Sequence, residues 1–206
     1  MRLIVGLGNP GKEYAKTRHN VGFRILDLLA KRLNTDFDRT KFKGEYAAGD
    51  LPEKWQGPQS GDGKLLLVKP QTYMNLSGET VLGFSGFYKV EPADVLVVVD
   101  DVALPVGALR MRPDGSPGGH NGLKDITARL GTQAFPRLRL GVGGRHAAPG
   151  SEKEQQPRDL AGHVLGRFSE AEEEVLKEKL ELSADACLYW AGHGAEKTAA
   201  KYNSKG

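Results

Sequence analysis

Cysteine is almost missing from the sequence, because Cys187 is the only one in 206 residues. A single cysteine cannot build a disulfide framework or a thiolate metal cluster. Cys187 also lies in an apolar stretch that is typical of the inside of a helix, so we interpret it as a core residue and not as a nucleophile. The chain is therefore not a disulfide-stabilised secreted domain or a thiolate-zinc protein.

Long hydrophobic runs are missing as well. No run of about 18 or more apolar residues occurs, so the sequence predicts no transmembrane helix. The first residues, Met1–Gly6, pass directly into an apolar strand pattern and a glycine turn. They lack the charged, long apolar and small-residue regions of a signal peptide. We therefore expect a cytoplasmic protein that has no membrane partner.

The common motifs for metal, nucleophile and dinucleotide chemistry do not fit either. The histidines form no H-E-x-x-H or H-x-x-x-H pair, so we expect no metal and no cofactor. Gly83–Gly86 has the wrong spacing for the G-x-S-x-G turn of a serine hydrolase. Gly6–Gly11 matches G-x-G-x-x-G, but Pro10 removes a backbone N–H from a loop that should hold a pyrophosphate. A nicotinamide oxidoreductase therefore stays a minor alternative.

Charge is present but unevenly distributed. The formal net charge is only +3, yet residues 107–146 carry seven basic side chains against two acidic ones. Residues 147–182 carry nine acidic side chains against five basic ones. A surface with this polarity could orient a polyanion, although an ordinary solvated surface would explain the same pattern.

Apolar periodicity predicts alternating strands and helices. Continuous apolar runs indicate strands that are covered on both faces at Leu3–Leu7, Leu65–Lys69 and Val95–Val99. Period-2 alternation predicts two more strands at residues 109–112 and 137–140, where the arginines of each strand should share a face. Helical patterns cover Asn20–Leu33, Gly78–Tyr88, Leu123–Leu130, Ser169 to about Trp190, and Ala195–Tyr202.

This order of elements predicts an α/β fold in a single domain over residues 1–206. The alternating segments add antiparallel edges, so the central sheet should be twisted, mixed and mostly parallel, with helices on its flanks. The sequence Ser169–Glu172 is a capping box at the start of the long helix. Two polar loops, at residues 52–63 and 145–158, have no assigned role. Nothing resembles a heptad seam, so we expect a monomer.

Polar side chains gather where the predicted strands end and where the helices begin. In an open α/β sheet, ligands bind at the carboxyl ends of the strands, so several of these side chains could meet in one cleft. Each of them also has an ordinary structural interpretation as a turn or cap residue. The residues are Asn9, His19, Asn75, Asp100, His120 and Asn121.

Six segments, taken together, resemble the bacterial peptidyl-tRNA hydrolase family. They occur in the order and spacing of that family over nearly the whole chain, which makes the set far more specific than any single segment. The resemblance implies a metal-independent enzyme that hydrolyses the ester bond between the peptide and the terminal adenosine of peptidyl-tRNA. The segments are Leu3–Gly11, Tyr14 with Thr17–Gly22, Lys69–Gly78, Asp100–Gly107, Gly118–Asp125 and Pro136–Val142.

The same resemblance implies roles for single residues. His19 corresponds to the catalytic base and Asp100 to the acid that orients it, while Asn9 looks like the residue that helps to distinguish a blocked peptidyl end from a free aminoacyl end. Arg112 and Arg139 match basic positions that grip tRNA phosphates. Further positions that match contacts with the tRNA end or the peptide are Tyr14, Tyr73, Met74, Asn75, His120 and Asn121.

The chain departs from the family pattern at three places. Pro117 stiffens a loop that is often made of small residues, Ala103 stands where many members carry a second acid, and the 145–158 loop is longer than usual. These departures concern substrate gating and tRNA docking and leave the chemistry intact.

The implied mechanism needs only protein side chains. A neutral imidazole, with an ordinary pKa of about 6.5, can take a proton from water near neutral pH. A carboxylate on the other ring nitrogen fixes the tautomer and stabilises the imidazolium, and the amide of Asn75 or Asn121 could stabilise the oxyanion. The main alternative is a non-enzymatic RNA-binding relative of the splicing-cofactor type, which motifs alone do not separate from the enzyme.

Overall fold

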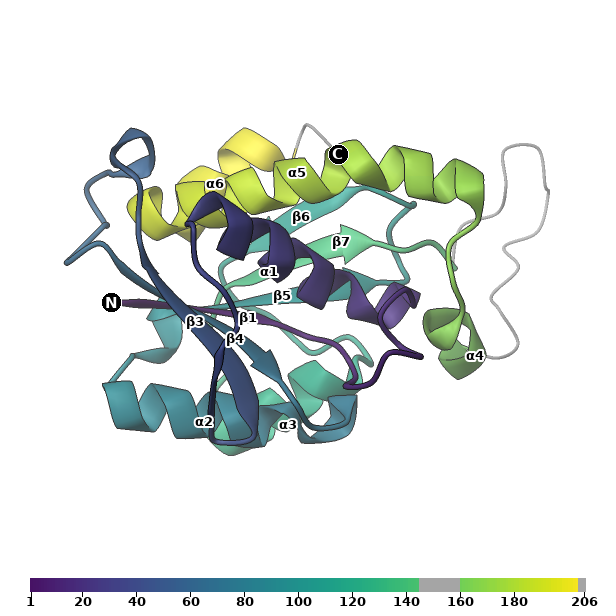
Figure 1. Cartoon of the computed structure of the whole chain (residues 1–206), viewed down its shortest axis with the longest axis horizontal. Coiled ribbons are helices and arrows are strands. Elements are labelled where there is room, and N and C mark those ends of the chain that lie inside the picture. Colours follow the sequence, from purple (N-terminus) through teal and green to yellow (C-terminus); the bar gives the residue numbers. More distant parts are fainter. Residues whose placement is uncertain (145–159, 204–206) are drawn as a thin grey trace.

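The computed structural model describes residues 1–144 and 160–203. Within these residues a seven-stranded sheet with the order β2-β3-β4-β1-β5-β7-β6 runs through the molecule, and helices cover both of its faces (Figure 1). The strands are β1 Arg2–Gly6, β2 Arg39–Lys41, β3 Gly44–Asp50, β4 Lys64–Pro70, β5 Val95–Asp101, β6 Leu109–Arg112 and β7 Arg137–Gly141. The helices are α1 Val21–Arg32, α2 Ser77–Tyr88, α3 Asn121–Leu130, α4 Leu160–Leu165, α5 Glu170–His193 and α6 Ala195–Tyr202.

The sheet is mixed and mostly parallel, as the sequence predicts. Its four central strands, β4, β1, β5 and β7, run parallel to one another. Strands β3 and β6 pair antiparallel with the outer members of this group. The short β2 pairs antiparallel with β3 and therefore runs in the same direction as the central strands.

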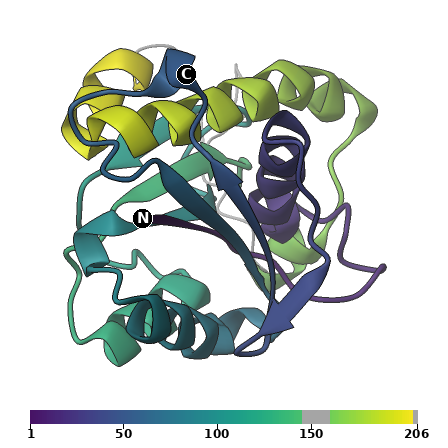
Figure 2. The same cartoon turned by 60° about the vertical axis from the view of Figure 1, so that its left-hand side comes forward.

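Two hydrophobic cores, one on each face, hold the helices to the sheet. Every residue of β1 and β5 is buried, which explains why these strands appear in the sequence as unbroken apolar runs. Alternate residues enter opposite cores: Ile4 packs with α1 and α5, whereas Leu3 and Val5 pack with α2 and α3. Figure 2 shows the sheet between these two helical layers.

The β2–β3 hairpin is missing from the sequence prediction. Its turn contains Phe42 and Lys43 with φ of 47° and 56°, so two side-chain-bearing residues occupy a conformation that glycine or asparagine usually signals. Strand β3 is only partly buried and shows no clear alternation. The hairpin therefore carries neither of the two signals by which such elements are recognised. The short helix α4 was also not predicted.

Of the two polar loops, the structure describes only the one at residues 52–63. The 52–63 loop contains a short 3-10 helix, Glu53–Trp55. It docks on the end of α5, where the backbone N–H of Gln59 donates to the carbonyl of Gly192 at 2.9 Å. The 145–158 loop lies outside the described residues.

Arg137 and Arg139 alternate along β7 as the sequence predicts, but Arg137 is not part of an exposed basic surface. Only 1% of Arg137 is exposed, because β5 and β6 pair with β7 on both sides and neighbouring loops cover its face. Its guanidinium donates to the carbonyls of Gly115, Gln133 and Phe135. Burial, together with the nearby charge of Arg139, lowers the pKa of Arg137 to about 10. Arg137 is thus an internal clamp for two loops and does not belong to the basic surface.

Helix α5 begins as the sequence predicts. The Ser169 hydroxyl accepts from the backbone N–H of Glu172, and the Glu172 carboxylate accepts from the backbone N–H of Ser169. Cys187 within this helix is fully buried, and burial raises the pKa of its thiol, which fits a core residue. None of the helices in the described part of the chain is long and apolar enough to cross a membrane.

Close packing at glycine brings the start of α1 onto the sheet. A Cβ added to Gly22 would lie 2.5 Å from the backbone N and O of Leu7 and 2.6 Å from the carbonyl oxygen of Val98. A Cβ added to Gly6 would lie 2.4 Å from the carbonyl oxygen of Gly22. Gly6 at the end of β1 and Gly22 in the first turn of α1 thus permit close helix–sheet packing, and the start of α1 is held against β1 and β5.

Replacing Gly22 by alanine should therefore destabilise the protein. Overpacking of this kind typically lowers the free energy of unfolding by about 1–3 kcal/mol. The atoms that a new Cβ would meet here belong to the backbone, which cannot move aside as a flexible side chain can. Gly86→Ala in α2 is the matched control, because a Cβ there would meet nothing within 4 Å. It should gain about 0.5–1 kcal/mol from helix propensity. Denaturant unfolding measures both changes, and a Gly22→Ala variant as stable as the wild type would contradict this packing.

Candidate active site

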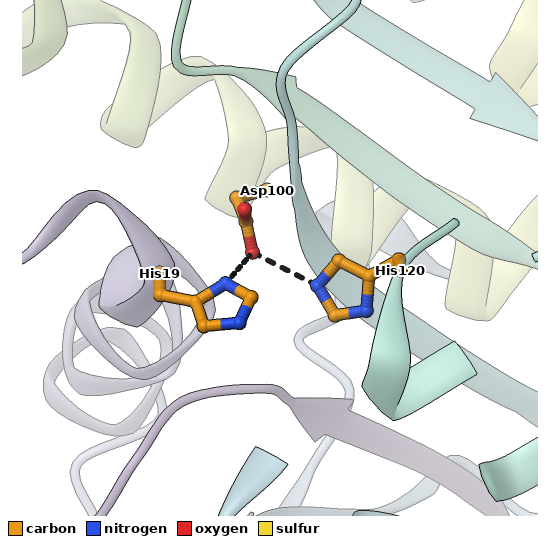
Figure 3. Close-up of side chains that lie close together, drawn as sticks. All are labelled: His19, Asp100 and His120. Atoms are coloured by element: carbon orange, nitrogen blue, oxygen red, sulfur yellow. Dashed lines mark hydrogen bonds and ion pairs between the residues drawn. The ribbon is translucent and has the colours of Figure 1, made fainter. Parts of the chain in front are cut away.

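Asp100, near the end of β5, joins two imidazoles that are distant in the sequence. Its Oδ1 lies 2.8 Å from Nδ1 of His19 and 3.0 Å from Nε2 of His120 (Figure 3). The two ring centroids are 5.0 Å apart. All three side chains are largely buried, with 2% of the Asp100 side chain exposed, 11% of His19 and 10% of His120. One carboxylate oxygen therefore fixes the positions of two rings.

The topology explains why these residues meet. His19 lies in the 3-10 helix η1, Arg18–Asn20, which connects the loop after β1 to α1. Asp100 lies near the end of β5, the parallel neighbour of β1. His120 is the N-cap of α3. Because β1 and β5 are adjacent and parallel, the segments that follow them emerge at the same edge of the sheet.

The hydrogen bonds determine the tautomers of both rings. The backbone N–H of Leu123 donates to Nδ1 of His120 at 3.3 Å, so this nitrogen is unprotonated and Nε2 carries the hydrogen that Asp100 accepts. His19 donates its Nδ1–H to the same carboxylate, and the lone pair of its Nε2 has no hydrogen-bond partner within residues 1–144 and 160–203. In this arrangement Nε2 of His19 can accept a proton, while the carboxylate of Asp100 binds the other ring nitrogen.

The electrostatic balance keeps Asp100 charged. Burial alone would raise the pKa of the Asp100 carboxyl, but the electrostatic attraction and the N–H hydrogen bonds of the His19 and His120 rings outweigh it and hold that pKa well below its usual range. Asp100 is therefore a carboxylate at neutral pH. A buried carboxylate in this position stabilises the imidazolium that forms when His19 takes up a proton.

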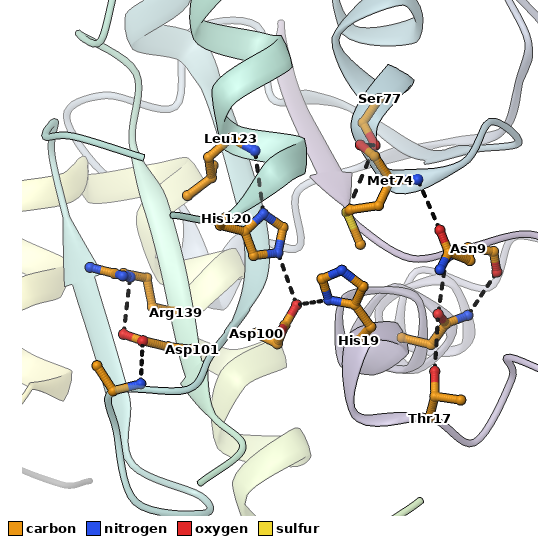
Figure 4. A network of polar contacts seen from close by, with 12 residues as sticks. Asn9, Thr17, His19, Met74, Ser77, Asp100, Asp101, His120, Leu123 and Arg139 are labelled. Carbon is orange, nitrogen blue, oxygen red and sulfur yellow. Dashed lines mark hydrogen bonds and ion pairs between the residues drawn. The ribbon is translucent and has the colours of Figure 1, made fainter. Parts of the chain in front are cut away.

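Asn9 is held in place by a second polar network. Its Oδ1 accepts from the backbone N–H of Met74 at 2.8 Å (Figure 4). Its backbone is bound on both sides by Asn20, whose Oδ1 accepts from Asn9 N and whose Nδ2 donates to Asn9 O, each at 2.9 Å. Because the oxygen of the Asn9 amide is occupied, its Nδ2 is the donor that remains for other partners.

Two cavities meet at His19. The first, of about 270 Å³, is lined by Asp100, His120 and Arg139 among others, and the second, of about 400 Å³, lies on the side of Asn9. The predicted site residues that line the second are Asn9, Tyr14, Tyr73, Met74, Asn75 and Asn121. His19 and Asn121 line both cavities. The structure therefore gathers every predicted site residue except Arg112 around one base.

The two predicted phosphate-binding arginines are placed differently. Arg139 lines the first cavity, and its Nε lies 3.1 Å from Oδ2 of Asp101 in an ion pair. Arg112 is exposed at the far end of β6, where it pairs in register with Arg137 and lies outside both cavities. A role for Arg112 would therefore concern a part of a large ligand that is distant from His19.

Two contributors to the site were not found from the sequence. Helix α4 forms a wall that both cavities share, through Ala161 and Val164. Asn20 is 1% exposed and supports Asn9. Asn20 stands beside His19 in the segment Thr17–Gly22, and that neighbourhood was its only signal. Helix α4 is too short to give a clear periodic pattern.

The site also groups three potential metal ligands, which the histidine spacing in the sequence does not reveal. Nδ1 of His19, Oδ1 of Asp100 and Nε2 of His120 lie within 4.8 Å of one another. The N···O distances of 2.8 and 3.0 Å are those of hydrogen bonds, and the Nδ1–H tautomer of His19 and the Nε2–H tautomer of His120 each place a hydrogen between the two atoms. The three groups thus form hydrogen bonds with one another, in which His19 and His120 donate and Asp100 accepts.

Comparisons with known proteins point to a single family. A family model described as peptidyl-tRNA hydrolase matches residues 3–206. The chain is 42% identical over 203 residues to a peptidyl-tRNA hydrolase of Clostridium botulinum strain Hall, covering 98% of this chain and 97% of that one. It is 43% identical over 205 residues to a peptidyl-tRNA hydrolase of Clostridium novyi, covering 98% of each.

The fold agrees as well. A crystal structure of peptidyl-tRNA hydrolase from Acinetobacter baumannii superposes with a TM-score of 0.82 at 33% identity, covering 99% of this chain and 95% of that one. The sequence match extends over nearly the full length of the chain and of its relatives, and the structural match extends over the same span. The chain therefore belongs to the peptidyl-tRNA hydrolase family.

Proposed function

We propose that the chain hydrolyses the ester bond between the peptide and the terminal adenosine of peptidyl-tRNA. The products are free tRNA and an N-acylated amino acid or peptide. The observation that carries this proposal is the 2.8 Å contact between His19 and Asp100 at the point where two cavities meet. Relatives at 42% and 43% identity that bear the name of this hydrolase support it.

In the proposed mechanism, Nε2 of His19 takes a proton from a water molecule as that water attacks the ester carbonyl. The new bond joins the water oxygen to the carbonyl carbon and gives a tetrahedral oxyanion. When the bond to the ribose oxygen breaks, the imidazolium returns its proton to that oxygen. Asp100 stabilises the imidazolium between these two transfers. No acyl-enzyme is required, which is consistent with the lack of a serine nucleophile motif.

Two asparagines can donate hydrogen bonds to the substrate, one to the acylated amino group and one to the oxyanion. The Nδ2 of Asn9 can donate to the carbonyl of an acylated amino group, whereas a free ammonium offers only donors and would gain nothing there. This difference favours peptidyl over aminoacyl substrates. Asn121 is the better candidate for the oxyanion donor, because it lines both cavities and is the first residue of α3.

The non-enzymatic RNA-binding alternative needs the basic surface but does not need an oriented base. The paired His19 and Asp100, with Nε2 of His19 free, favour the enzyme. A turnover assay on N-acetyl-aminoacyl-tRNA separates the two functions, since an RNA-binding relative would bind this substrate without releasing the acylated amino acid. We further propose that the protein acts in the cytoplasm as a monomer.

His19→Ala should lower kcat by at least ~10²-fold, the usual contribution of a positioned general base. Binding of tRNA should stay near the wild-type level, because the base supplies no phosphate contact. Release of N-acetyl amino acid measures the rate. His193→Ala is the control, since His193 lies outside both cavities and stacks on Tyr189 at 4.1 Å. Near-normal turnover by His19→Ala would remove this residue from the mechanism.

Asp100→Asn should keep the fold and lower kcat by up to ~10⁴-fold. An amide cannot stabilise the imidazolium, and its NH₂ group can impose the wrong tautomer on His19. Steady-state kinetics, with circular dichroism as a check of the fold, measure the effect. Unchanged kinetics in a folded variant would show that the carboxylate does not assist the base.

The two arginines should respond differently to neutralisation. Arg112→Gln should reduce the slope of log affinity for tRNA against log salt by about 1, because one phosphate contact is lost. Arg139→Gln should change the slope less, because Asp101 already offsets the charge of Arg139. A short N-acyl-aminoacyl ester should be hydrolysed normally by Arg112→Gln. An equal loss on short and full-length substrates would mean that Arg112 does not contact tRNA.

A further inference from the structure

The side chain of Arg18, next to His19, is bound on several sides. Its Nη1 donates to the carbonyl of Val142 at 2.9 Å and to Oε1 of Glu172 at 3.0 Å. Its Nη2 donates to Oε2 of Glu172 at 2.8 Å, which completes a bidentate pair. Only 11% of the Arg18 side chain is exposed. Burial would raise the pKa of Glu172, but the bonds from Arg18 and from the Ser169 backbone hold it below its usual range.

The backbone beside Arg18 is tied to the same region. The N–H of Arg18 donates to the carbonyl of Gly166 at 2.9 Å, and Thr17 forms an isolated antiparallel bridge with Arg167. The guanidinium of Arg18 lies 4.5 Å from the centre of the Phe168 ring. The turn that carries His19 therefore runs directly against residues 166–168, which follow α4.

These contacts connect the base to the wall of the active site. Val142 follows β7 and Glu172 lies in the first turn of α5, so Arg18 holds both ends of the stretch that contains α4. No residue of α4 is buried, and the helix packs against η1, the turn that carries His19. Its His163 reaches the carbonyl of Val142 at 3.3 Å, the same oxygen that Arg18 binds. Figure 1 shows α4 at the edge of the molecule, beside the turn before α1.

We propose that Arg18 is a positioning residue that fixes the α4 wall of the two cavities relative to the imidazole of His19. The inference rests on the proposed function only in that His19 is taken as the base. A substrate held between α4 and His19 depends on this separation, and a misplacement of about 1 Å can cost ~10²-fold in rate. Arg18 itself acts through His19 and α4 and contacts neither cavity.

The molecule contains a matched control for an ordinary ion pair. Arg24 of α1 forms a bidentate pair with Glu173 of α5, with distances of 3.0 and 2.6 Å. The carboxylates are similarly exposed, at 33% for Glu173 and 29% for Glu172, whereas Arg24 is more exposed than Arg18, at 23% against 11%. Among the described residues, however, Arg24 makes no hydrogen bond to Val142 or to the backbone of residues 166–168, and its guanidinium lies 5.9 Å from the centre of the Phe168 ring, against 4.5 Å for Arg18. The two pairs share their chemistry and differ in the connection to α4 and His19.

The experiment compares Arg18→Lys with Arg24→Lys, and Glu172→Gln with Glu173→Gln. Lysine keeps the charge but cannot bind Val142 and both carboxylate oxygens in the same fixed fork. Glutamine at 172 still offers an oxygen to the Ser169 backbone, so the helix cap survives. We expect Arg18→Lys and Glu172→Gln to lose at least ~10-fold in kcat with tRNA affinity unchanged. The control variants should lose similar thermal stability and keep wild-type kcat.

A second measurement needs no substrate. ¹⁵N NMR of the His19 ring reports its tautomer, and we expect the signal of the Nδ1-protonated form to weaken in Arg18→Lys and to stay unchanged in Arg24→Lys. The proposal is overturned if Arg18→Lys and Arg24→Lys lose the same kcat and show the same His19 spectrum. If the wild type itself does not turn over peptidyl-tRNA, the proposed function fails, and the spectra alone then decide the positioning role. If Arg18→Lys does not fold, Glu172→Gln against Glu173→Gln gives the same comparison.

Discussion

One carboxylate oxygen, buried at the carboxyl edge of a parallel sheet, is the constraint on which the site depends. A carboxylate without partners would be costly to bury, and here the ring N–H groups of two histidines compensate it. Since the two histidines come from different loops, the same oxygen also joins the segment after β1 to the start of α3. The charge that the proposed chemistry requires is therefore also a structural link between loops.

The rest of the fold supplies the fixed positions from which this link is made. The adjacency of β1 and β5 brings the two segments to one edge, and the close approach at Gly22 lowers the start of α1 onto that edge. Asn20 then ties the loop of Asn9 to the same turn. In contrast, α4 contributes a wall but no buried residue, and it is held by packing against η1 and by the contact of His163 with the carbonyl of Val142. The site thus combines residues at the ends of β1 and β5, which the core fixes, with the helix α4, which contacts outside the core hold in place.

The sequence is informative where burial is complete on both faces of an element. Strands β1, β4 and β5 appear as unbroken apolar runs for that reason, and the capping box marks the start of α5. The β2–β3 hairpin escapes because Phe42 and Lys43 take positive φ without a glycine signal. The burial of Arg137 does not follow from the sequence, because alternation in a strand does not tell whether a loop covers its outer face.

For the site, position at strand ends and the family resemblance together were enough to propose Asn9, His19 and Asp100, and the geometry brings these three around one cleft. Asn20 and Arg18, their immediate neighbours, were not identified. Their importance lies in contacts with distant parts of the chain, such as that between Arg18 and Glu172, and no local pattern encodes such contacts.

The junction of two cavities at a single imidazole has a consequence for how a reaction would end. If the scissile ester spans that junction, cleavage leaves the acyl fragment in one chamber and the nucleotide in the other. Neither fragment then needs to pass the other on its way to solvent. The two products can then dissociate in either order, and the product that dissociates more slowly determines how soon the next substrate can enter.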